Sequence, residues 1–448
     1  MNRLDKVALS VIFCLAVVVV AVAWIGNPTQ LQAELIQEDG ISPLGPITLE
    51  FSQPINVTAL SEKLSLEPQG VLVVEAVSPR RVSIVPDRMI RPEEPATLRI
   101  SPGTFGINGE SLRAELSWKT SSRAAKIIFL GSEPNPQEIF SVALDGSAPE
   151  QLTQSGGGIY DFDAAPNGEQ IVYSLVNDQG GIDLWLMGRN GQDAHRLLNC
   201  SGDRCTTPAF SPDGKWLAYT RETAAIPPDI PRGAPRPWVL DLESDQNAPV
   251  YADPQLIGYG PSWAPAGSLF ASWDGINGGI HVIDLQSGEE TLLPTESGEV
   301  GGWSPDGMQM LFTRYEPVDQ GYRSFIYRAD FNTGEVGVFL GAGDYDSAYG
   351  TPAWSPDGAQ IAFSLRLNDD SPARSIWIVT PDYLGGPMIE AEPDTTYGFY
   401  RWDPWGTALV FQQTLLGGDS RDEIAIYQLS TGQVQGLAED GSMPQWLP

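Results

Sequence analysis

Histidine, cysteine and basic residues are scarce in this chain of 448 residues. Its two histidines, His195 and His281, and three cysteines are too few for histidine-rich metal sites or cysteine-based zinc modules, so we predict no metal site. The 26 Lys and Arg residues face 57 Asp and Glu residues, which gives a net charge of −31. That charge repels phosphate backbones and argues against a nucleic-acid partner.

Turn-forming and aromatic residues are abundant instead. The chain contains 47 Gly, 37 Pro and 13 Trp residues, and 42% of its residues are hydrophobic. This composition is too apolar for a disordered acidic chain, and the glycines and prolines leave little room for long helices. We therefore predict an all-β protein, and its length predicts more than one compact unit.

The N-terminus carries an apolar run long enough to span a bilayer. Residues 7–25 are apolar apart from Ser10, and Arg3 and Lys6 precede them. The positive charges predict a signal anchor, a single transmembrane helix that leaves the bulk of the chain outside the cytoplasmic membrane. The alternative is a signal peptide cleaved at Ala23, which would make the protein secreted. In both cases residues 1–30 form this segment with a short linker, and the remainder is exported.

Two cysteines lie close together in the exported part. Cys200 and Cys205 enclose the short polar sequence Ser-Gly-Asp-Arg. Oxidation is permitted outside the cytoplasm, so we predict a local disulfide between them. The spacing is wider than that of redox-active Cys-x-x-Cys pairs, which favours a structural bond.

Residues 35–122 have the pattern of a small β-sandwich. Short apolar runs alternate with Pro and Gly turns at the spacing of sandwich strands. The runs are Ile47–Phe51, Val71–Val74, Val82–Val85, Ala96–Ile100 and Leu112–Trp118. With the flanking sequences 42–55 and 100–103, this segment resembles the Ig-like module of bacterial cell-surface proteins. The resemblance implies a spacer without a site of its own.

Residues 123–448 contain a repeat. Each copy has an aromatic residue, a small residue, Pro, a turn that ends in Gly, and then a strand such as Gln360-Ile-Ala-Phe363. The repeat prolines are Pro166, Pro212, Pro265, Pro305, Pro356, Pro404 and Pro448, with a mean spacing of 47 residues. That period is typical of a four-stranded propeller blade.

The first and last copies of the repeat are each incomplete. Residues 126–152 supply three strands with no inner strand before them, and residues 442–446 supply an inner strand at the other end. We therefore predict that the C-terminal strand pairs with the strand around Ile127. This pairing closes a ring of seven blades and removes its open edge.

The repeated motif Trp/Phe-Ser-Pro-Asp-Gly at 210–214, 303–307 and 354–358 closely resembles the TolB-like, WD-like β-propeller family. The same family supplies the propeller of prolyl-oligopeptidase-type peptidases. Many of its members have six blades, so six is the alternative count. Three copies depart from the motif: the first reads Ala164-Ala-Pro-Asn, the third has Ala266 for Asp, and the sixth has Trp405 for Asp. Those turns are expected to differ in shape.

The repeated polar and aromatic residues have structural explanations. Pro, Asp and Gly suit successive positions of a turn, so Asp213, Asp306 and Asp357 are interpreted as turn formers and not as catalytic carboxylates. The tryptophans of the repeat are expected to wedge between adjacent blades. They are Trp263, Trp303, Trp354, Trp402 and Trp446.

Paired acids and the two histidines are the remaining candidates for chemistry. The pairs are Asp161/Asp163, Asp344/Asp346 and Asp369/Asp370. They could bind structural calcium, but none forms a complete calcium loop, so solvated loop acids are the preferred interpretation and we predict no cofactor. His281, within a strand, and His195, near a strand start, are interpreted as packed or surface residues.

A weaker feature precedes the inner strands. Tyr259, Tyr349 and Tyr397 are each followed by Gly and lie six or seven residues before a repeat proline, and Tyr160 lies nearby in the first copy. Loops that enter the innermost strands converge at one mouth of a propeller, so these tyrosines are candidate binding residues for a peptide or sugar. Packing between blades is the alternative.

These features together predict a non-enzymatic, membrane-anchored binding or scaffold protein. The sequence contains no Gly-x-Ser-x-Gly motif and ends where the propeller closes, so no hydrolase domain is expected. Expected partners are proteins, peptides or glycans of the cell envelope, and the 16 basic against 44 acidic residues of 123–448 favour cationic ones. The alternative is a hydrolase or lyase of envelope polysaccharide, which two facing carboxylates with raised pKa in the propeller funnel would favour.

Overall fold

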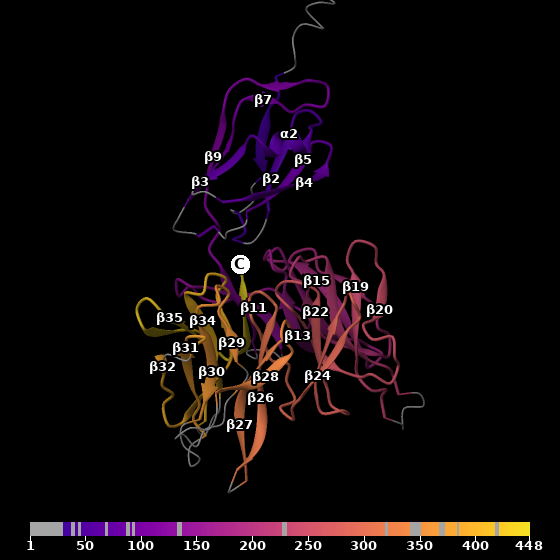
Figure 1. Ribbon diagram of the computed structural model, residues 1–448, viewed down its shortest axis with the longest axis vertical. Helices are drawn as coiled ribbons and strands as arrows, with labels where there is room; N and C mark the ends of the chain where they lie inside the picture. The colour runs from indigo at the N-terminus through magenta and orange to yellow at the C-terminus, as the bar shows by residue number, and fades with distance from the viewer. Residues whose placement is uncertain are drawn as a thin grey trace, which may run out of the picture. The chain divides into compact units, whose positions relative to one another are not determined.

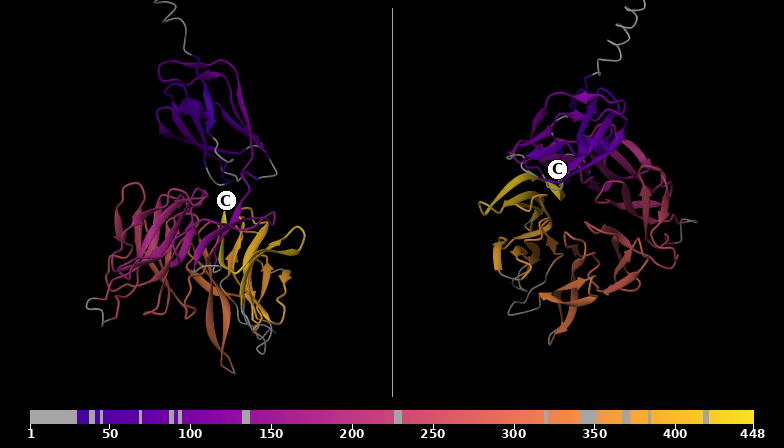
Figure 2. Two further views of the ribbon diagram at one scale, coloured as in Figure 1. Left: turned by 180° about the vertical axis from the view of Figure 1, so that it is seen from behind. Right: turned by 45° about the horizontal axis from the view of Figure 1, so that its top comes forward.

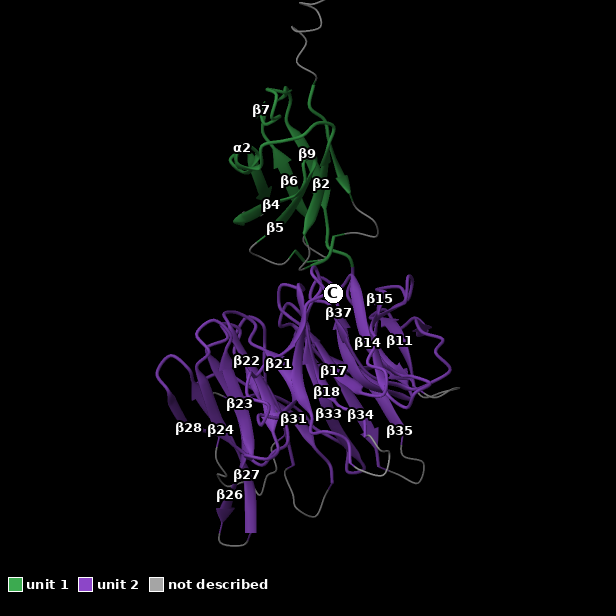
Figure 3. Ribbon diagram, turned by 90° about the vertical axis from the view of Figure 1, so that its right-hand side faces the viewer, with its two compact units in different colours: residues 1–123 green, residues 124–448 purple. Residues whose placement is uncertain are grey.

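The computed structural model describes residues 30–36, 41–43, 46–67, 70–86, 90–91, 95–131, 137–225, 231–318, 321–340, 350, 352–366, 372–382, 385–416 and 421–448. The chain divides into two compact units, residues 1–123 and 124–448 (Figure 3). Helix in the described residues is limited to α2 (Val57–Ser61), so the fold is all-β as predicted. The expected anchor or signal peptide lies outside the described residues, and no helix within them is long and apolar enough to cross a membrane.

Unit 1 is built from two sheets that share one core. Its strands are β1 (Ala33–Ile36), β2 (Ile47–Phe51), β3 (Leu64–Glu67), β4 (Leu72–Ser78), β5 (Arg81–Pro86), β6 (Ala96–Ile100), β7 (Gly103–Thr104), β8 (Ser111–Leu112) and β9 (Leu116–Thr120). One sheet has the order β1-β2-β5-β4, the other β3-β6-β9, and β7 pairs with β8. Alternate residues of the strands face inward, so that Leu49, Val82 and Leu98 are fully buried in one cluster.

The strand pattern of unit 1 differs from the expected one in two respects. The run Leu112–Trp118 is divided between β8 and β9, because residues 113–115 are exposed and break the alternation of buried and exposed residues. The helix α2 was not expected, since five residues are too few to show a helical period. It begins at Asn56, whose side-chain oxygen accepts a hydrogen bond from the Ala59 N–H at 3.2 Å.

Unit 2 consists of four-stranded antiparallel sheets that follow one another around a ring (Figures 1 and 2). Its first strands are β10 (Lys126–Gly131), β11 (Glu138–Ala143), β12 (Glu150–Gln151), β13 (Ile159–Ala164), β14 (Gln170–Val176), β15 (Ile182–Gly188), β16 (His195–Leu198), β17 (Arg204–Phe210), β18 (Trp216–Glu222), β19 (Arg236–Asp241), β20 (Asn247–Pro249), β21 (Tyr259–Trp263), β22 (Leu269–Asp274), β23 (Gly279–Asp284) and β24 (Glu290–Pro294).

The remaining strands of unit 2 continue this arrangement. They are β25 (Gly302–Trp303), β26 (Gln309–Val318), β27 (Gly321–Asp330), β28 (Glu335–Leu340), β29 (Ala353–Trp354), β30 (Ile361–Leu365), β31 (Ser375–Val379), β32 (Gly385–Ile389), β33 (Thr395–Trp402), β34 (Ala408–Leu415), β35 (Arg421–Gln428), β36 (Gln433–Glu439) and β37 (Gly441–Leu447). Each group from β21 onward pairs in chain order, whereas β13–β16 and β17–β20 are joined into one sheet by a single parallel pair.

The ring is closed by the C-terminal strand. Strand β37 pairs antiparallel with β10, and Ile127 lies opposite Trp446, which is the pairing that the incomplete repeats predict. In Figure 2 the yellow C-terminal strands accordingly return to the strands that begin unit 2. The sheet β12-β11-β10-β37 therefore contains both ends of the unit.

Hydrophobic clusters and tryptophans fill the space between neighbouring sheets. Trp402 Nε1 donates a hydrogen bond to the Ala353 carbonyl at 3.0 Å, and Trp446 Nε1 donates to the Arg401 carbonyl at 3.0 Å. Trp263 and Trp303 likewise donate to residues of the preceding sheet. The repeat tryptophans thus lie between sheets, where the sequence predicts them.

Candidate functional site

The carboxylates of the repeated turns are structural, as expected. Asp213, Asp306 and Asp357 each accept a hydrogen bond from the serine hydroxyl two residues earlier, at 2.5–2.6 Å. In the sixth copy Asp403 stands at the position of this serine, and its carboxylate accepts bonds from the N–H groups of Thr407 and Ala408 at 2.6 and 3.0 Å. These acids are committed to the backbone of their own turns.

Asp161 and Asp163 on β13 are strand residues held by the next sheet, and not the solvated loop acids that the sequence favours. Asp161 accepts bonds from the Ser174 hydroxyl and, at 2.5 Å, from the Thr207 N–H, and Asp163 accepts the Phe210 N–H at 2.8 Å. Burial raises the pKa of Asp161 to about 6 and the pKa of Asp163 to about 7. Both carboxylates therefore link β13 to the next sheet.

The other two acid pairs lie outside the described residues. Within the described ranges, no group of three or more His, Cys, Asp and Glu residues is arranged to hold a metal ion.

Three successive sheets carry polar or charged side chains at the same position of the repeat. Three positions before the repeat proline, β33, β37 and β13 carry Arg401, Gln445 and Asp163. The corresponding residues of the other sheets are the small Ala209, Ser262, Gly302 and Ala353. Gln445 Nε2 donates to the Phe162 carbonyl at 3.1 Å, and the charge of Arg401 opposes the rise in the pKa of Asp163.

A pocket of 410 Å³ next to this row is the main candidate site. It lies before β25, at the start of β29 and along β33. Its side chains comprise two guanidinium groups, one carboxylate and three aromatic rings. They are Arg374, Arg401, Glu299, Tyr397, Phe399 and Tyr400. The pocket therefore combines both signs of charge with apolar surface.

An irregularity in β33 shapes the pocket. The register between β33 and β34 shifts between Gly398 and Arg401, and Phe399 has φ of 49°, in the left-handed region that bulky residues avoid. The Phe399 side chain is 56% exposed. Tyr400 is buried, and its hydroxyl oxygen accepts the Ser364 N–H at 3.0 Å. The bulge thus exposes the Phe399 ring to solvent, while the buried Tyr400 side chain anchors the strand.

The charged groups of the pocket influence one another. Desolvation raises the pKa of Glu299, and the guanidinium groups of Arg374 and Arg401 oppose this rise. The Arg374 carbonyl accepts the Tyr397 N–H, with a nitrogen–oxygen distance of 3.1 Å, which joins the start of β31 to β33. Glu299 is thereby a carboxylate with a raised pKa beside two cations.

Of the predicted tyrosines that the structure describes, Tyr397 lines this pocket and Tyr160 and Tyr259 do not. Tyr397 lines the pocket but is buried, with its ring 4.9 Å from that of Phe411. Tyr259 does not line it; its hydroxyl donates to the Gly298 carbonyl at 3.0 Å, next to Glu299. Tyr160 is exposed and also lies outside the pocket lining, and Tyr349 lies outside the described residues.

Three charged residues of the pocket are not among the candidates that the sequence suggests. Glu299 precedes β25, Arg374 precedes β31 and Arg401 lies in β33, and they belong to no common motif. A usable signal existed for Arg401, since only this copy of the repeat has a cation three residues before its proline. Basic residues are rare in unit 2, so two of them in one pocket concentrate positive charge there.

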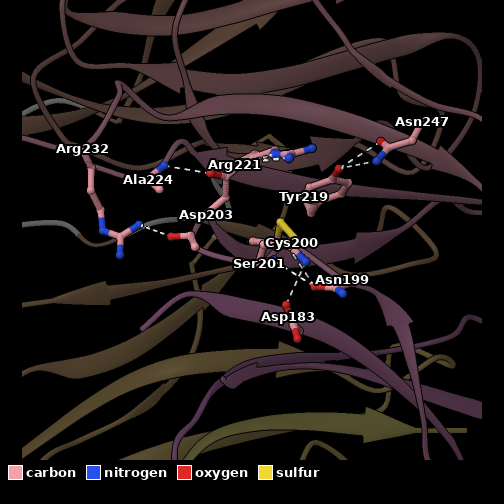
Figure 4. A network of polar contacts seen from close by, with 12 residues as sticks. Asp183, Asn199, Cys200, Ser201, Asp203, Tyr219, Arg221, Ala224, Arg232 and Asn247 are labelled. Carbon is pink, nitrogen blue, oxygen red and sulfur yellow. Dashed lines mark hydrogen bonds and ion pairs between the residues drawn. A yellow bond between two sulfur atoms is a disulfide. The ribbon is translucent and has the colours of Figure 1, made fainter. Parts of the chain in front are cut away.

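The predicted disulfide between Cys200 and Cys205 is present. It closes the connection between β16 and β17 and lies in a polar network (Figure 4). Asp183 accepts the Cys200 N–H at 2.8 Å, and Asp203 forms a 2.7 Å ion pair with Arg221. These contacts stabilise the segment that connects β16 to β17.

The histidines are not part of the pocket. His281 is buried in β23, where its ring stacks on Tyr251 at 4.7 Å and its Nε2 lies 3.2 Å from a Glu290 oxygen. His195 is exposed at the start of β16. These positions agree with packed and surface residues.

Comparison with known proteins finds distant relatives, and no family model matches the sequence. Dipeptidyl-peptidase 5 of Porphyromonas gingivalis is 23% identical over 320 residues, which make up 68% of this chain and 44% of that protein. A TolB homolog of Chlorobium chlorochromatii is 28% identical over 149 residues, 32% of this chain and 31% of the homolog. The fold is a TolB-like β-propeller. A solved prolyl endopeptidase structure, 10% identical, superposes with a TM-score of 0.52 and covers 86% of this chain and 51% of its own.

The prediction of a non-enzymatic protein is wrong. The proteins that this chain resembles include a dipeptidyl-peptidase and a prolyl endopeptidase, both peptide hydrolases by name. The chain spans less than half the length of that dipeptidyl-peptidase. The non-enzymatic prediction rests on the lack of a catalytic motif in the sequence. The residues that recur in a propeller are selected by its turns and by packing between sheets, so they do not indicate whether the propeller belongs to an enzyme.

Proposed function

We propose that this chain is the substrate-binding TolB-like propeller of a peptide hydrolase. The observation that carries this proposal is the pocket that brings Arg374, Arg401 and Glu299 together beside the exposed ring of Phe399. Guanidinium groups bind carboxylates and carbonyl oxygens, a carboxylate binds an amino group, and an aromatic ring covers an apolar side chain. A short peptide offers all of these groups. The likeness to Dipeptidyl-peptidase 5 supports a peptide as the substrate.

A second candidate is a hydrolase or lyase that acts on acidic envelope polysaccharide. Its support is Glu299, whose raised pKa suits a proton donor, next to two arginines that could bind sugar carboxylates. Among the described residues, the other acids with a clearly raised pKa are Asp161 and Asp163, which are held by backbone N–H groups of the next sheet. A glycosidase needs a second carboxylate across the scissile bond. Peptide binding therefore has the better support.

The proposal includes an architecture and a location. We propose seven blades, supported by the succession of four-stranded groups closed by β37, and an Ig-like spacer, supported by the two-sheet core of unit 1. The disulfide supports an oxidising, extracytoplasmic compartment. The apolar residues 7–25 support membrane anchorage or secretion, and the acidic excess of unit 2 supports cationic partners at the envelope.

Titration calorimetry of the full chain with the peptide Ala-Pro-Ala tests the proposal. We expect binding that weakens at least tenfold in Arg401→Gln, because the peptide loses a charged partner. The control is Arg421→Gln, which removes an exposed cation of β35 paired with Glu423. Equal affinity of the two variants would contradict the proposal. Binding of trigalacturonate in place of the peptide would favour the second candidate.

A further inference from the structure

A second pocket lies at the opposite ends of the inner strands, between the turns that follow β17 and β21. It has a volume of 300 Å³. Its lining comes from both turns and from the strands that begin or end beside them. The side chains that matter here are Pro212, Asp213, Trp216, Trp263, Pro265 and Leu285.

At the other repeat turns the turn glycine faces an atom of the preceding turn, or, at Gly168, of the C-terminal Pro448. A side chain added at Gly168 would strike the Pro448 carbonyl, and one added at Gly307 would strike the Ala266 carbonyl. A Cβ atom added at Gly406, Gly358 or Gly214 would lie 3.2, 3.7 or 4.0 Å from the preceding turn. At Gly267, by contrast, an added Cβ atom would have only one described atom within 4 Å, and this atom belongs to Met308 in the following turn. The third turn is thus separated from the second, and the pocket fills this interval.

The third turn is one of three whose sequence departs from the motif, and it lacks both polar residues of the motif. Ala264 and Ala266 replace the Ser and Asp that are hydrogen-bonded to each other in the second, fourth and fifth turns. The bond from the turn glycine N–H to the carbonyl three residues earlier is present in the turns of Gly168, Gly214, Gly307, Gly358 and Gly406. No such bond is found at Gly267 among the described residues. The two alanines remove the polar contacts that tighten this turn.

The lining of this pocket favours an apolar ligand group. Trp216 is 38% exposed and Leu285 is 43% exposed. The Ser211 hydroxyl binds Asp213 and accepts the Trp216 N–H, and the Ser268 hydroxyl donates to Asp284 at 2.6 Å. Sugar hydroxyls would therefore find few uncommitted partners. Asp213 supplies negative charge in a strongly acidic unit.

We propose that this pocket docks an extended protein segment that inserts a Leu or Pro side chain flanked by Lys or Arg. The two indole rings and the prolines cover the apolar group, and Asp213 attracts the flanking cation. The volume admits one or two such side chains. This site is separate from the pocket of Arg401, so it does not depend on the proposed function.

Titration of the full chain with the capped peptide Ac-Lys-Leu-Pro-Lys-NH2 tests this inference. We expect binding that weakens at least tenfold in Trp216→Ala and in Leu285→Lys, and that is at least tenfold weaker for Ac-Glu-Leu-Pro-Glu-NH2. The control is Gln360→Ala. Gln360 occupies the position of Trp216 in the repeat turn after β29, since each residue donates its N–H to the serine five residues earlier. Arg401→Gln should leave this binding unchanged.

Two outcomes would overturn the proposal. One is equal affinity of the lysine peptide for the wild type, Trp216→Ala and Leu285→Lys, or no binding to the wild type at all. The other is binding of chitotriose that requires Trp216 while the peptide does not bind, which would make the pocket a carbohydrate site. Leu285→Lys changes an exposed residue, so it retains the test if Trp216→Ala fails to fold.

Discussion

Trp402 and Trp354 occupy the same position in neighbouring repeats but differ in one hydrogen bond. Trp402 Nε1 donates to the Ala353 carbonyl at 3.0 Å, whereas Trp354 Nε1 is buried without a partner. Trp402→Phe should therefore lower the free energy of unfolding by about 1 kcal/mol more than Trp354→Phe, because only the Trp402 substitution removes a hydrogen bond. Urea denaturation of the two variants measures the difference. Equal losses would contradict a role for the bond.

Asp163 should make stability depend on pH. An aspartate in an unfolded chain titrates near pH 4, whereas the pKa of folded Asp163 is about 7. Between these values the folded protein holds the extra proton, so this residue lowers stability as the pH rises from about 4 to 7. Asp163→Asn cannot titrate, and we expect it to reduce this loss by at least about 1 kcal/mol, since one pKa unit corresponds to about 1.4 kcal/mol.

Asp306 supplies a control of opposite sign for this experiment. Bonds from the Ser304 hydroxyl and the Met308 N–H lower the pKa of Asp306, so its contribution is present above the unfolded pKa and is lost as the pH falls. Asp306→Asn should therefore destabilise the protein more at pH 7 than at pH 3. Urea denaturation between pH 3 and pH 7 measures how the free energy of unfolding of each variant depends on pH. A change of this dependence in the same direction in both variants would refute the opposite pKa shifts of Asp163 and Asp306.

At the scale of elements, the disulfide secures the connection between two sheets. Cys200 and Cys205 are almost fully buried and close a loop of six residues between β16 and β17. Closing a loop of this length in the unfolded chain accounts for roughly 2 kcal/mol. The variant with both cysteines changed to Ser should lose about that much free energy of unfolding, measured in urea, and should still bind the peptide probe of the Arg401 pocket. An unchanged midpoint would show that the polar network around Asp183 suffices.

At the scale of the whole molecule, the propeller depends on one pairing between its ends. Deleting residues 441–448 removes β37 and exposes the edge of β10, together with Ile127 and Phe129 in the cluster that Trp446 shares. We expect this deletion to abolish cooperative thermal unfolding and to cause aggregation. Deleting Pro448 alone keeps β37 and should preserve a cooperative transition. Cooperative unfolding of the longer deletion, followed by circular dichroism, would refute this dependence.

The repeat made much of unit 2 predictable. Proline, aspartate and glycine mark each turn because few other residues suit those backbone positions, and the incomplete copies at the two ends pointed to the pairing of Ile127 with Trp446. In unit 1 the strand around Leu112 was predicted as one element and is two, since its apolar pattern continues through residues that the tertiary structure exposes.

The candidate site was far less predictable. Tyr397 alone was expected there, and it lies buried against Phe411. Glu299, Arg374 and Arg401 lie far apart in the sequence, and no local rule of spacing connects them.

Local chemistry alone was enough to specify most strands and turns of unit 2 and the closure of its ring, because turn residues and the repeat tryptophans act over a few positions and then recur. The two pockets arose only from the packing of separate sheets. One exists because a bulge in β33 presents Phe399 beside charges from neighbouring sheets. The other exists because two alanines leave a turn apart from the one before it. Both depend on distances between residues that chain order does not constrain.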